Sequence, residues 1–388
     1  MKPKKKICVV VASRANYSSI KSAMRAIQEH PELELQVVSA ASALLDRYGS
    51  VVDLVEGDGF PSDARVHMIV EGETPLTMAK STGLGLLELP TVFAALQPDV
   101  VLTVGDRFET MATTLAATYM NIPLAHTMGG EVSGNIDECI RHAITKFAHI
   151  HFPACEDAKE RILRLGEEPE RVHLVGCPRM DLVAQILAES GDKPPTPEIF
   201  EEGVGGAFDL TQPFLLVSQH PVTTEYGAGE GQVAATLEAV VGSGLPTIML
   251  WPNSDAGSED VARGMRKFRE RQDDSKIHFF KNLPIRDYVL LMRHTACLIG
   301  NSSSGIREGP FMGTPVVNVG TRQDRRQRGG NVIDVESYRA DELQAAIAKQ
   351  VEHGRYDHDP IYGDGHAGEK IAAHLAETEI ELIKRITY

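Results

Sequence analysis

Two segments that lie far apart in the sequence combine residue types that can carry out chemistry. The first segment, between Gly105 and Lys146, holds several acidic and basic side chains, namely Asp106, Arg107, Glu109, Glu131, Asp137, Arg141 and His142. Carboxylates that converge on one site raise one another's pKa values, so that one accepts a proton and another donates one near neutral pH. The first segment therefore indicates acid/base catalysis, in which a proton is removed from carbon and later returned.

The second segment runs from Gly300 to Glu308 and is rich in glycine and serine. It follows an apolar run and precedes a helix that we expect to begin near Ile306. Backbone amides in such a turn bind phosphate because their N–H dipoles point outward at the start of a helix. The alternative is a serine that only caps the helix, since the segment matches neither a Walker A loop nor a dinucleotide fingerprint.

Four arginines follow the next apolar run: Arg322, Arg325, Arg326 and Arg328. Arginine binds phosphate through two parallel hydrogen bonds, so a cluster of arginines in an acidic chain suits a diphosphate. A solvated surface loop is the alternative interpretation. We expect Arg322 to lie nearest the ligand and the other three to belong to the surface.

Single candidates in both halves also have structural alternatives. Asp106 is either an acid/base group or the cap of a helix over 108–120. Asp137 and Arg141 share a helix face and form either part of a site or a surface ion pair. His220 follows a predicted strand and is an acid/base group, a donor to an anion, or a structural histidine.

The elements that must position these residues are predicted from short apolar runs that alternate with amphipathic stretches of helix length. The runs of the first half cover residues 7–12, 35–39, 99–104, 122–126, 150–153 and 172–176, and those of the second half cover 213–218, 246–251, 277–280, 296–300, 315–319 and 332–335. This alternation is typical of parallel sheets built from strand–helix–strand units. It predicts an α/β protein with two similar domains.

The boundary between the two domains is predicted to lie between Cys177 and Pro213, where glycine and proline concentrate. We assign residues 1–178 to the first domain, together with a helix over 366–388 that packs back on it, and residues 179–365 to the second. The candidate residues lie just after predicted strands, and ligands of open α/β sheets bind beyond the carboxyl ends of strands. We therefore expect the site in a cleft between the domains.

Composition excludes several classes of function. The 388 residues carry 39 basic and 54 acidic side chains, a formal charge of −15, which argues against nucleic-acid binding. No apolar run approaches the length of a membrane span, and the apolar run after the basic start is too short for a signal peptide, so we expect a cytoplasmic protein without membrane contact. The five cysteines lack a Cys-x-x-Cys pair, and His149 and His151 have no third partner. We expect no disulfide, no metal and no cofactor.

The chain resembles the hydrolysing UDP-N-acetylglucosamine 2-epimerases of sialic acid and legionaminic acid biosynthesis. The matching segments are 13–18, 105–109, 129–137, 140–146, 220–225 and 300–308, and they occur in order across both predicted domains. The resemblance implies the GT-B fold, in which two Rossmann-like domains flank a deep cleft and the second domain holds most of the nucleotide.

The resemblance also implies a reaction in two stages. The enzyme removes the proton at C2 of the sugar and expels UDP from C1, which gives a 2-acetamidoglucal. Water then adds at C1 while C2 is reprotonated on the opposite face, so that UDP-N-acetylglucosamine yields N-acetylmannosamine and UDP. The same reaction on UDP- or GDP-linked 2,4-diacetamido-2,4,6-trideoxyglucose is the alternative. A GT-B glycosyltransferase, a non-hydrolysing 2-epimerase and an inactive sugar-nucleotide sensor are less favoured.

By position, the resemblance implies roles for individual residues. The implied catalytic residues are Asp106, Glu131, Asp137 and His220. The implied contacts to nucleotide or substrate are Arg14, Ser18, Arg107, Arg141, Ser302, Ser303, Glu308 and Arg322. The implied partners are the nucleotide sugar, UDP as product, and further copies of the chain in a dimer or tetramer.

Overall fold

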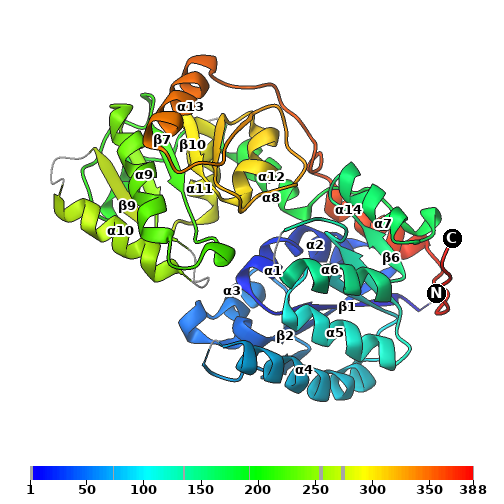
Figure 1. Cartoon of the computed structure of the whole chain (residues 1–388). Coiled ribbons are helices and arrows are strands. Elements are labelled where there is room, and N and C mark those ends of the chain that lie inside the picture. Colours follow the sequence, from blue (N-terminus) through cyan, green and yellow to red (C-terminus); the bar gives the residue numbers. More distant parts are fainter. Residues whose placement is uncertain are drawn as a thin grey trace. The chain divides into compact units, whose positions relative to one another are not determined.

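The chain folds into two compact units, each with its own parallel sheet (Figure 1). The computed structural model describes residues 3–72, 74–133, 136–191, 193–252, 257–271 and 276–387. The first unit contains the chain up to Val132, Ile136–Leu182 and the chain from Tyr362 onward, and the second contains Val183–Ile361. The chain thus passes from the first unit to the second within one helix, α8 (Pro178–Ser190).

The first unit contains a six-stranded sheet in the order β3-β2-β1-β4-β5-β6, with parallel neighbours throughout. Its strands are β1 (Lys5–Val11), β2 (Leu33–Ala40), β3 (Ala64–Val66), β4 (Val100–Val104), β5 (Leu124–Thr127) and β6 (Ile150–Phe152). Its other helices are α1 (Arg14–Ser18), α2 (Lys21–Glu29), α3 (Val51–Gly57), α4 (Pro75–Leu96), α5 (Phe108–Tyr119), α6 (Ile136–Phe147), α7 (Glu156–Arg164) and α14 (Ala367–Glu377). The strand order reverses between β1 and β4, and ligands of such sheets bind at this switch point.

The second unit repeats this topology with the strand order β12-β11-β10-β7-β8-β9. Its strands are β7 (Leu215–Ser218), β8 (Thr247–Leu250), β9 (Ile277–Phe280), β10 (Cys297–Gly300), β11 (Val316–Val319) and β12 (Val332–Val335). Its helices are α9 (Gly229–Gly242), α10 (Ser258–Arg271), α11 (Ile285–His294), α12 (Ser303–Met312) and α13 (Ala340–His353). The first strand, β7, pairs with the fourth, β10, so the second switch point lies between these two strands.

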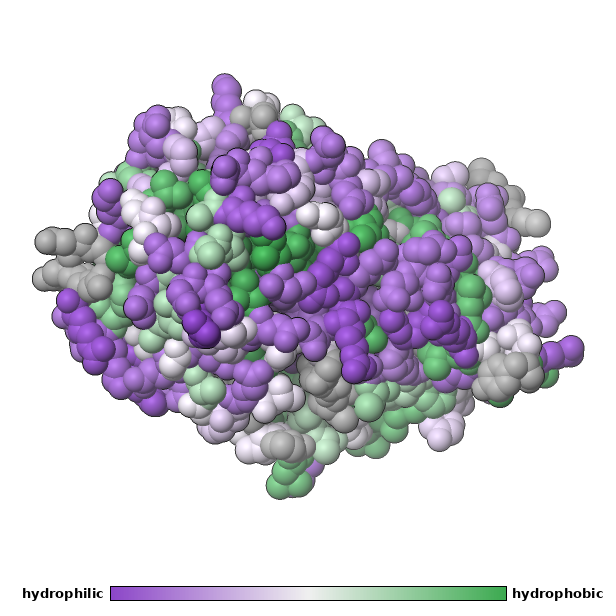
Figure 2. All heavy atoms as spheres, turned by 45° about the horizontal axis from the view of Figure 1, so that its top comes forward, coloured by the Kyte–Doolittle hydropathy of each residue, from purple (hydrophilic) through white to green (hydrophobic). Residues whose placement is uncertain are grey.

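Each unit has an apolar core between its sheet and the helices. In the first unit, side chains of α4, α5 and α6 pack on one face of the sheet, and in the second unit those of α9, α10 and α13 do so. Figure 2 shows that hydrophilic residues cover most of the visible face, with apolar residues in scattered patches. None of the helices in the described part of the chain combines the length and apolar content that a bilayer crossing would need.

The predicted fold class, two Rossmann-like α/β units, is confirmed. Most predicted strands are present within one or two residues, and the helix predicted over 108–120 is α5. The cleft that we expect between the units stays a prediction.

Several predictions about single elements are wrong. Residues 172–176 form no strand: His173 N donates to His151 O at 2.9 Å, but only an isolated bridge joins the segment to β6. β3 escaped prediction because three residues are too few to show a pattern. The helix that we expected near Ile306 begins at Ser303.

The helix predicted over 366–388 is shorter than expected: α14 begins at Ala367, within the first unit, but ends at Glu377. β-branched residues crowd the segment beyond it, and such residues are poor helix formers. The carbonyl groups of this segment accept hydrogen bonds from side chains of the first unit instead, as at Thr378 O, which accepts from Lys5 Nζ at 2.7 Å. The two ends of the chain therefore lie side by side (Figure 1).

Candidate functional site

The turn after β4 presents Asp106 at the first switch point. Gly105 has φ +74°, a conformation that favours glycine. Both backbone groups of Gly105 are hydrogen-bonded to residues of β5. Gly105 N donates to Thr127 O at 3.2 Å, and His126 Nε2 lies 2.8 Å from Gly105 O. His126 is fully buried, and burial lowers its pKa to about 3. The imidazole is therefore neutral, and its Nε2–H donates to the carbonyl.

Arg141 holds Asp106 and Glu131 together beside this turn. Arg141 is 2% exposed and lies on α6, whose Ile144 is buried in the core. Its Nη2 forms an ion pair with Asp106 Oδ2, and its Nη1 donates to Glu131 O at 2.6 Å. A buried guanidinium needs such partners because the desolvation of a charge is costly. The interpretation of Arg141 as part of a surface ion pair is thus wrong.

Glu109, in the first turn of α5, is a fourth carboxylate in this cluster and was not among the predicted site residues. Its side chain is 2% exposed and lies 3.3 Å from Nε of Arg107. Burial raises the pKa of Glu109, the nearby Arg107 charge opposes this rise, and the charge of Asp137 adds to it. The coupling places Asp137 near Glu109. The sequence signal that pointed to Glu109 was its closeness to Asp106 along the chain, but the resemblance to the family implied no role for Glu109.

The second switch point brings the turn after β10 against the turn after β7. Gly300 has φ +127°, and a Cβ at this position would lie 2.2 Å from Ser218 O, so only glycine permits the approach. The next residue, Asn301, is fully buried. Its Oδ1 accepts from His220 N at 2.7 Å and its Nδ2 donates to His220 O at 2.8 Å. Asn301 thereby fixes the backbone of His220.

Asn301 also holds the loop after β11. Asn301 O accepts hydrogen bonds from Arg322 Nη1 at 3.1 Å and from the buried Gln323 Nε2 at 2.8 Å. One residue therefore connects the loops that follow β7, β10 and β11. Among the other arginines of the loop, Arg328 pairs with Asp334 at 2.9 Å, which is a structural contact. Asn301 was not a predicted site residue. Its glycine and serine neighbours indicate a turn, but they do not indicate that its side-chain amide bonds to a distant loop.

The serine turn is ordered by a network of hydroxyl groups. Ser302 is the N-cap of α12, and its Oγ accepts from Ser304 N at 3.4 Å. Ser304 Oγ lies 2.8 Å from Ser302 Oγ and 2.5 Å from the hydroxyl of Tyr288 on α11. Burial raises the pKa of Tyr288, which remains a neutral hydroxyl. Ser218 Oγ lies 3.5 Å from His220 Nε2. The cap is thus present, and capping leaves other amides at the helix start available to an anion.

The remaining predicted residues occupy the ends of the same strands. Arg14 and Ser18 lie on α1, directly after β1. A Cβ at Gly49 would lie 3.2 Å from Arg14 Nη2, and Ser18 Oγ donates to Ala15 O at 3.1 Å. Ser303 is the first residue of α12, and Glu308 is buried on this helix, near enough to Tyr288 to raise the pKa of its hydroxyl. In the described residues, no group of three His, Cys, Asp or Glu side chains is arranged to hold a metal ion.

The fold agrees with comparisons to known proteins. Residues 25–376 match the family model described as UDP-N-acetylglucosamine 2-epimerase. The chain belongs to the UDP-N-acetylglucosamine 2-epimerase family. Among its relatives, the UDP-N,N'-diacetylbacillosamine 2-epimerase (hydrolyzing) of Legionella pneumophila is 32% identical over 94% of each chain. The UDP-N-acetylglucosamine 2-epimerase of Neisseria meningitidis serogroup B is 28% identical over 93% of this chain and 91% of that one.

A solved structure of this family shares the fold over nearly the whole chain. The crystal structure of UDP-GlcNAc 2-epimerase from Neisseria meningitidis bound to UDP-GlcNAc aligns with a TM-score of 0.79 at 17% identity. The alignment covers 96% of this chain and all of that one. The two Rossmann-like units are therefore the architecture of the family.

Proposed function

We propose that the chain is a hydrolysing 2-epimerase that converts a UDP-linked 2-acetamido sugar to the free 2-epimer and UDP. The observation that carries the proposal is the cluster at the first switch point, where a buried arginine pairs with Asp106 while the pKa of a second carboxylate, that of Glu109, is raised. Proton transfer at carbon needs one group that accepts a proton and another that donates one. Membership of the epimerase family identifies C2 of the sugar as that carbon.

In the proposed mechanism the acids of the first unit act on the sugar and the second unit holds the UDP. One of Asp106, Glu131 and Asp137 takes the proton from C2, and the C1–O bond to UDP breaks with its electron pair leaving on the diphosphate. A second acid of the cluster then protonates C2 on the opposite face while water supplies the hydroxyl at C1. Arg141, which pairs with Asp106, and Arg107, which pairs with Glu109, are proposed to bind the same substrate.

The second unit is proposed to bind the diphosphate at the start of α12. The amides of Ser302 and Ser303, the side chain of Arg322 and the imidazole of His220 are the donors, and Glu308 accepts from ribose hydroxyls. Arg14 and Ser18 complete the nucleotide contacts. Charge neutralisation at the leaving group lowers the barrier to C1–O cleavage, so binding of UDP at this position assists the elimination.

The sugar carried by UDP is proposed to be N,N'-diacetylbacillosamine, which is 2,4-diacetamido-2,4,6-trideoxyglucose. The relative named for this sugar is 32% identical, whereas the relative named for UDP-N-acetylglucosamine is 28% identical. These identities reverse the order of preference that the sequence alone gave. UDP-N-acetylglucosamine is the second candidate.

The reaction is tested in D2O with each UDP sugar supplied separately. We expect free 2-epimer with one deuterium at C2 and an equal amount of UDP, measured by NMR of the products. Unlabelled free sugar would contradict elimination, and a labelled product still attached to UDP would indicate a non-hydrolysing epimerase. UDP release that requires an added acceptor would indicate a glycosyltransferase, and intact substrate a sensor.

A further inference from the structure

A segment that follows α14, residues 378–387, is fastened to the first unit by polar contacts and is here called the tail. Lys5 Nζ donates to Thr378 O at 2.7 Å, and Arg171 Nη1 donates to Glu379 O at 3.0 Å. His149 Nε2 contacts Leu382 O at 3.0 Å, and Thr387 N donates to Gly166 O at 3.3 Å. The apolar tail residues Leu382, Ile383 and Ile386 are exposed, so burial of apolar surface contributes little to this attachment.

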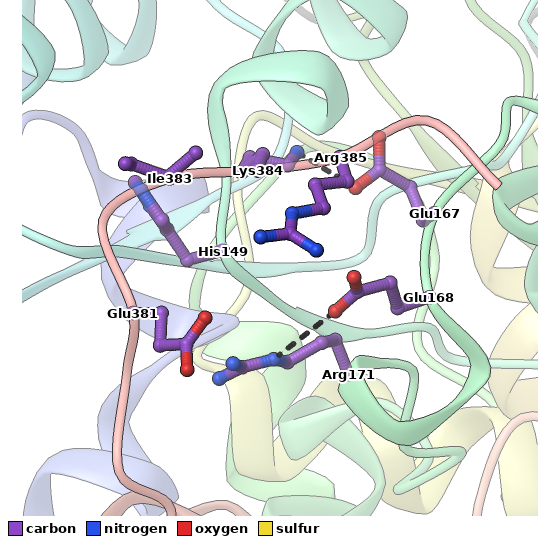
Figure 3. Close-up of a pocket in the computed structure, with 8 residues that line it drawn as sticks. All are labelled: His149, Glu167, Glu168, Arg171, Glu381, Ile383, Lys384 and Arg385. Carbon is purple, nitrogen blue, oxygen red and sulfur yellow. Dashed lines mark ion pairs between the residues drawn. The ribbon is translucent and has the colours of Figure 1, made fainter.

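Figure 3 shows Lys384 of the tail, which forms an ion pair with the buried Glu167. Its Nζ donates to Lys146 O at 2.8 Å, to Thr145 O at 3.3 Å and to Glu167 Oε2 at 2.7 Å. Thr145 and Lys146 belong to the last turn of α6, whose carbonyl groups have no partner within the helix. A cation at this position also interacts favourably with the helix dipole. Lys384 is therefore the C-terminal cap of α6.

Glu167 fixes the position of the Lys384 ammonium. Its side chain is 3% exposed and also contacts Lys146 Nζ at 2.6 Å and His151 Nε2 at 3.0 Å. Burial alone would raise the pKa of Glu167, but the hydrogen bonds from His151, Lys146 and Lys384 lower it to about 2. The cavity beside this cluster, about 20 Å3, is too small for any ligand larger than water. The cluster is thus a structural attachment and no ligand site.

The helix that Lys384 caps carries candidate catalytic groups. Thr145 Oγ1 donates to Arg141 O at 3.1 Å, and one turn of helix connects the cap to the Arg141 guanidinium, which contacts Asp106 and Glu131. Asp137 lies in the first turn of the same helix. A shift of α6 along its axis would therefore displace all the contacts of Arg141 at once.

We propose that Lys384 is a positioning residue that sets the axial position of α6, and with it the geometry of the carboxylate cluster. The inference rests on the proposed function for its catalytic consequence and on the contacts of Lys384 for its structural one. A displacement of about 1 Å at reacting groups lowers turnover by up to about 10²-fold. We expect loss of the cap to lower turnover while leaving the nucleotide contacts of the second unit intact.

The test compares Lys384→Met with Lys370→Met. Lys370 also pairs with a carboxylate, Asp364 at 2.7 Å, but it lies on α14 and this pair is exposed to solvent. For Lys384→Met we expect kcat to fall roughly 10-fold with an unchanged Kd for UDP, and faster amide hydrogen exchange in residues 136–147. Lys370→Met is expected to leave all three unchanged. Lys384→Gln, which keeps a donor without the charge, should be intermediate.

Three results would overturn the inference. Unchanged hydrogen exchange in α6 of Lys384→Met would show that the lysine does not cap the helix. Faster exchange with normal kcat would show that the cap does not position the cluster. If the wild-type chain has no epimerase activity, the proposed function fails, but the exchange measurement still tests the cap. A loss of UDP binding equal to the loss of kcat would indicate general destabilisation and would also contradict the positioning role.

Discussion

The two switch points share one topology but differ in the chemistry of the turn and in the residue that braces it. In the first unit, the turn after β4 carries Asp106 and is braced by His126, which donates to Gly105 O. In the second unit, the turn after β10 carries serines and is braced by the amide of Asn301. The comparison shows that the fold supplies a position at the strand ends, and under the proposed function the residues in the turn decide whether protons or anions are handled there.

The sharpest test of this division is Asp106→Asn. The amide keeps the size of the side chain but cannot act as a base, so we expect turnover to fall by a factor on the order of 10² or more. UDP affinity should stay unchanged, because the proposed phosphate contacts belong to the second unit. Turnover is measured by release of free sugar and affinity by calorimetry with UDP.

Asp99→Asn is the matched control for this substitution. Asp99 lies at the opposite end of β4 and accepts from Lys6 N at 2.8 Å. We expect near-normal turnover from this variant. Equal losses of turnover in the two variants, or weak UDP binding in Asp106→Asn, would contradict the proposal that the first switch point handles protons and the second binds the nucleotide.

Asn301→Ala tests the brace of the second switch point. The substitution removes both side-chain hydrogen bonds to His220, each worth about 1 kcal/mol, and loosens the loops after β7 and β10. We expect the Kd for UDP to rise roughly 10-fold or more. The control is Asn331→Ala, which removes a buried amide that donates to Thr314 O at 2.8 Å. Asn331 precedes β12 and therefore lies at the end of the sheet opposite to the serine turn.

Both asparagine variants should lose similar stability in thermal unfolding, but only Asn301→Ala should lose UDP affinity. A parallel loss of affinity in Asn331→Ala would mean that the second unit responds as a whole. Normal affinity in Asn301→Ala would remove this residue from the site.

Arg322→Gln is expected to have a smaller effect. Its guanidinium contacts Asn301 O and is proposed to contact one phosphate, so its loss should weaken UDP about 10-fold. Arg328→Gln serves as the control because Arg328 is not among the proposed phosphate contacts: it pairs with Asp334 and donates to Gln323 O at 2.8 Å. Calorimetry with UDP separates the two variants. Equal effects would indicate that the loop attracts the anion only through its total charge.

The sequence was sufficient for all the strands but β3 and for the location of both turns. Buried strands have continuous apolar runs, and glycine follows or ends the strand at both turns, so β4 with Gly105 and β10 with Gly300 were both recognisable. The resemblance identified the charged residues of each turn. Both signals are local in the sequence, which is why they could be found without coordinates.

The groups that hold the turns could not be predicted, because their partners are distant in the sequence. Asn301 contacts His220 across 81 positions, and Lys384 contacts Thr145 across 239. No periodicity or composition reports such a pairing. The tail was mistaken for helix for the same reason, since the lysine, arginine and histidine that satisfy its carbonyl groups lie elsewhere in the chain.

His126 and Asn301, which hold the turns at the two switch points, should respond differently to acid. The pKa of His126 is about 3 because the imidazole is buried, against an ordinary value of 6.5. Between these values His126 binds a proton in the unfolded chain but not in the folded chain. Its contribution to folding stability is therefore fully present above pH 6.5 and is lost as the pH falls below 6.5. At pH 5.5 this loss is about 1.4 kcal/mol for one such group. Asn301 does not titrate, so its brace adds no such loss.

His126→Gln should therefore flatten the pH dependence of the first unit. Glutamine keeps an N–H donor for Gly105 O but has no proton to gain. We expect urea unfolding to show a smaller loss of stability between pH 7.5 and 5.5 than in the wild type, by up to about 1.4 kcal/mol. Hydrogen exchange at both pH values would assign the change to residues near β4 and β5. An identical slope in the variant would mean that His126 binds protons equally in the folded and the unfolded chain, and His126 and Asn301 would then not differ in their response to acid.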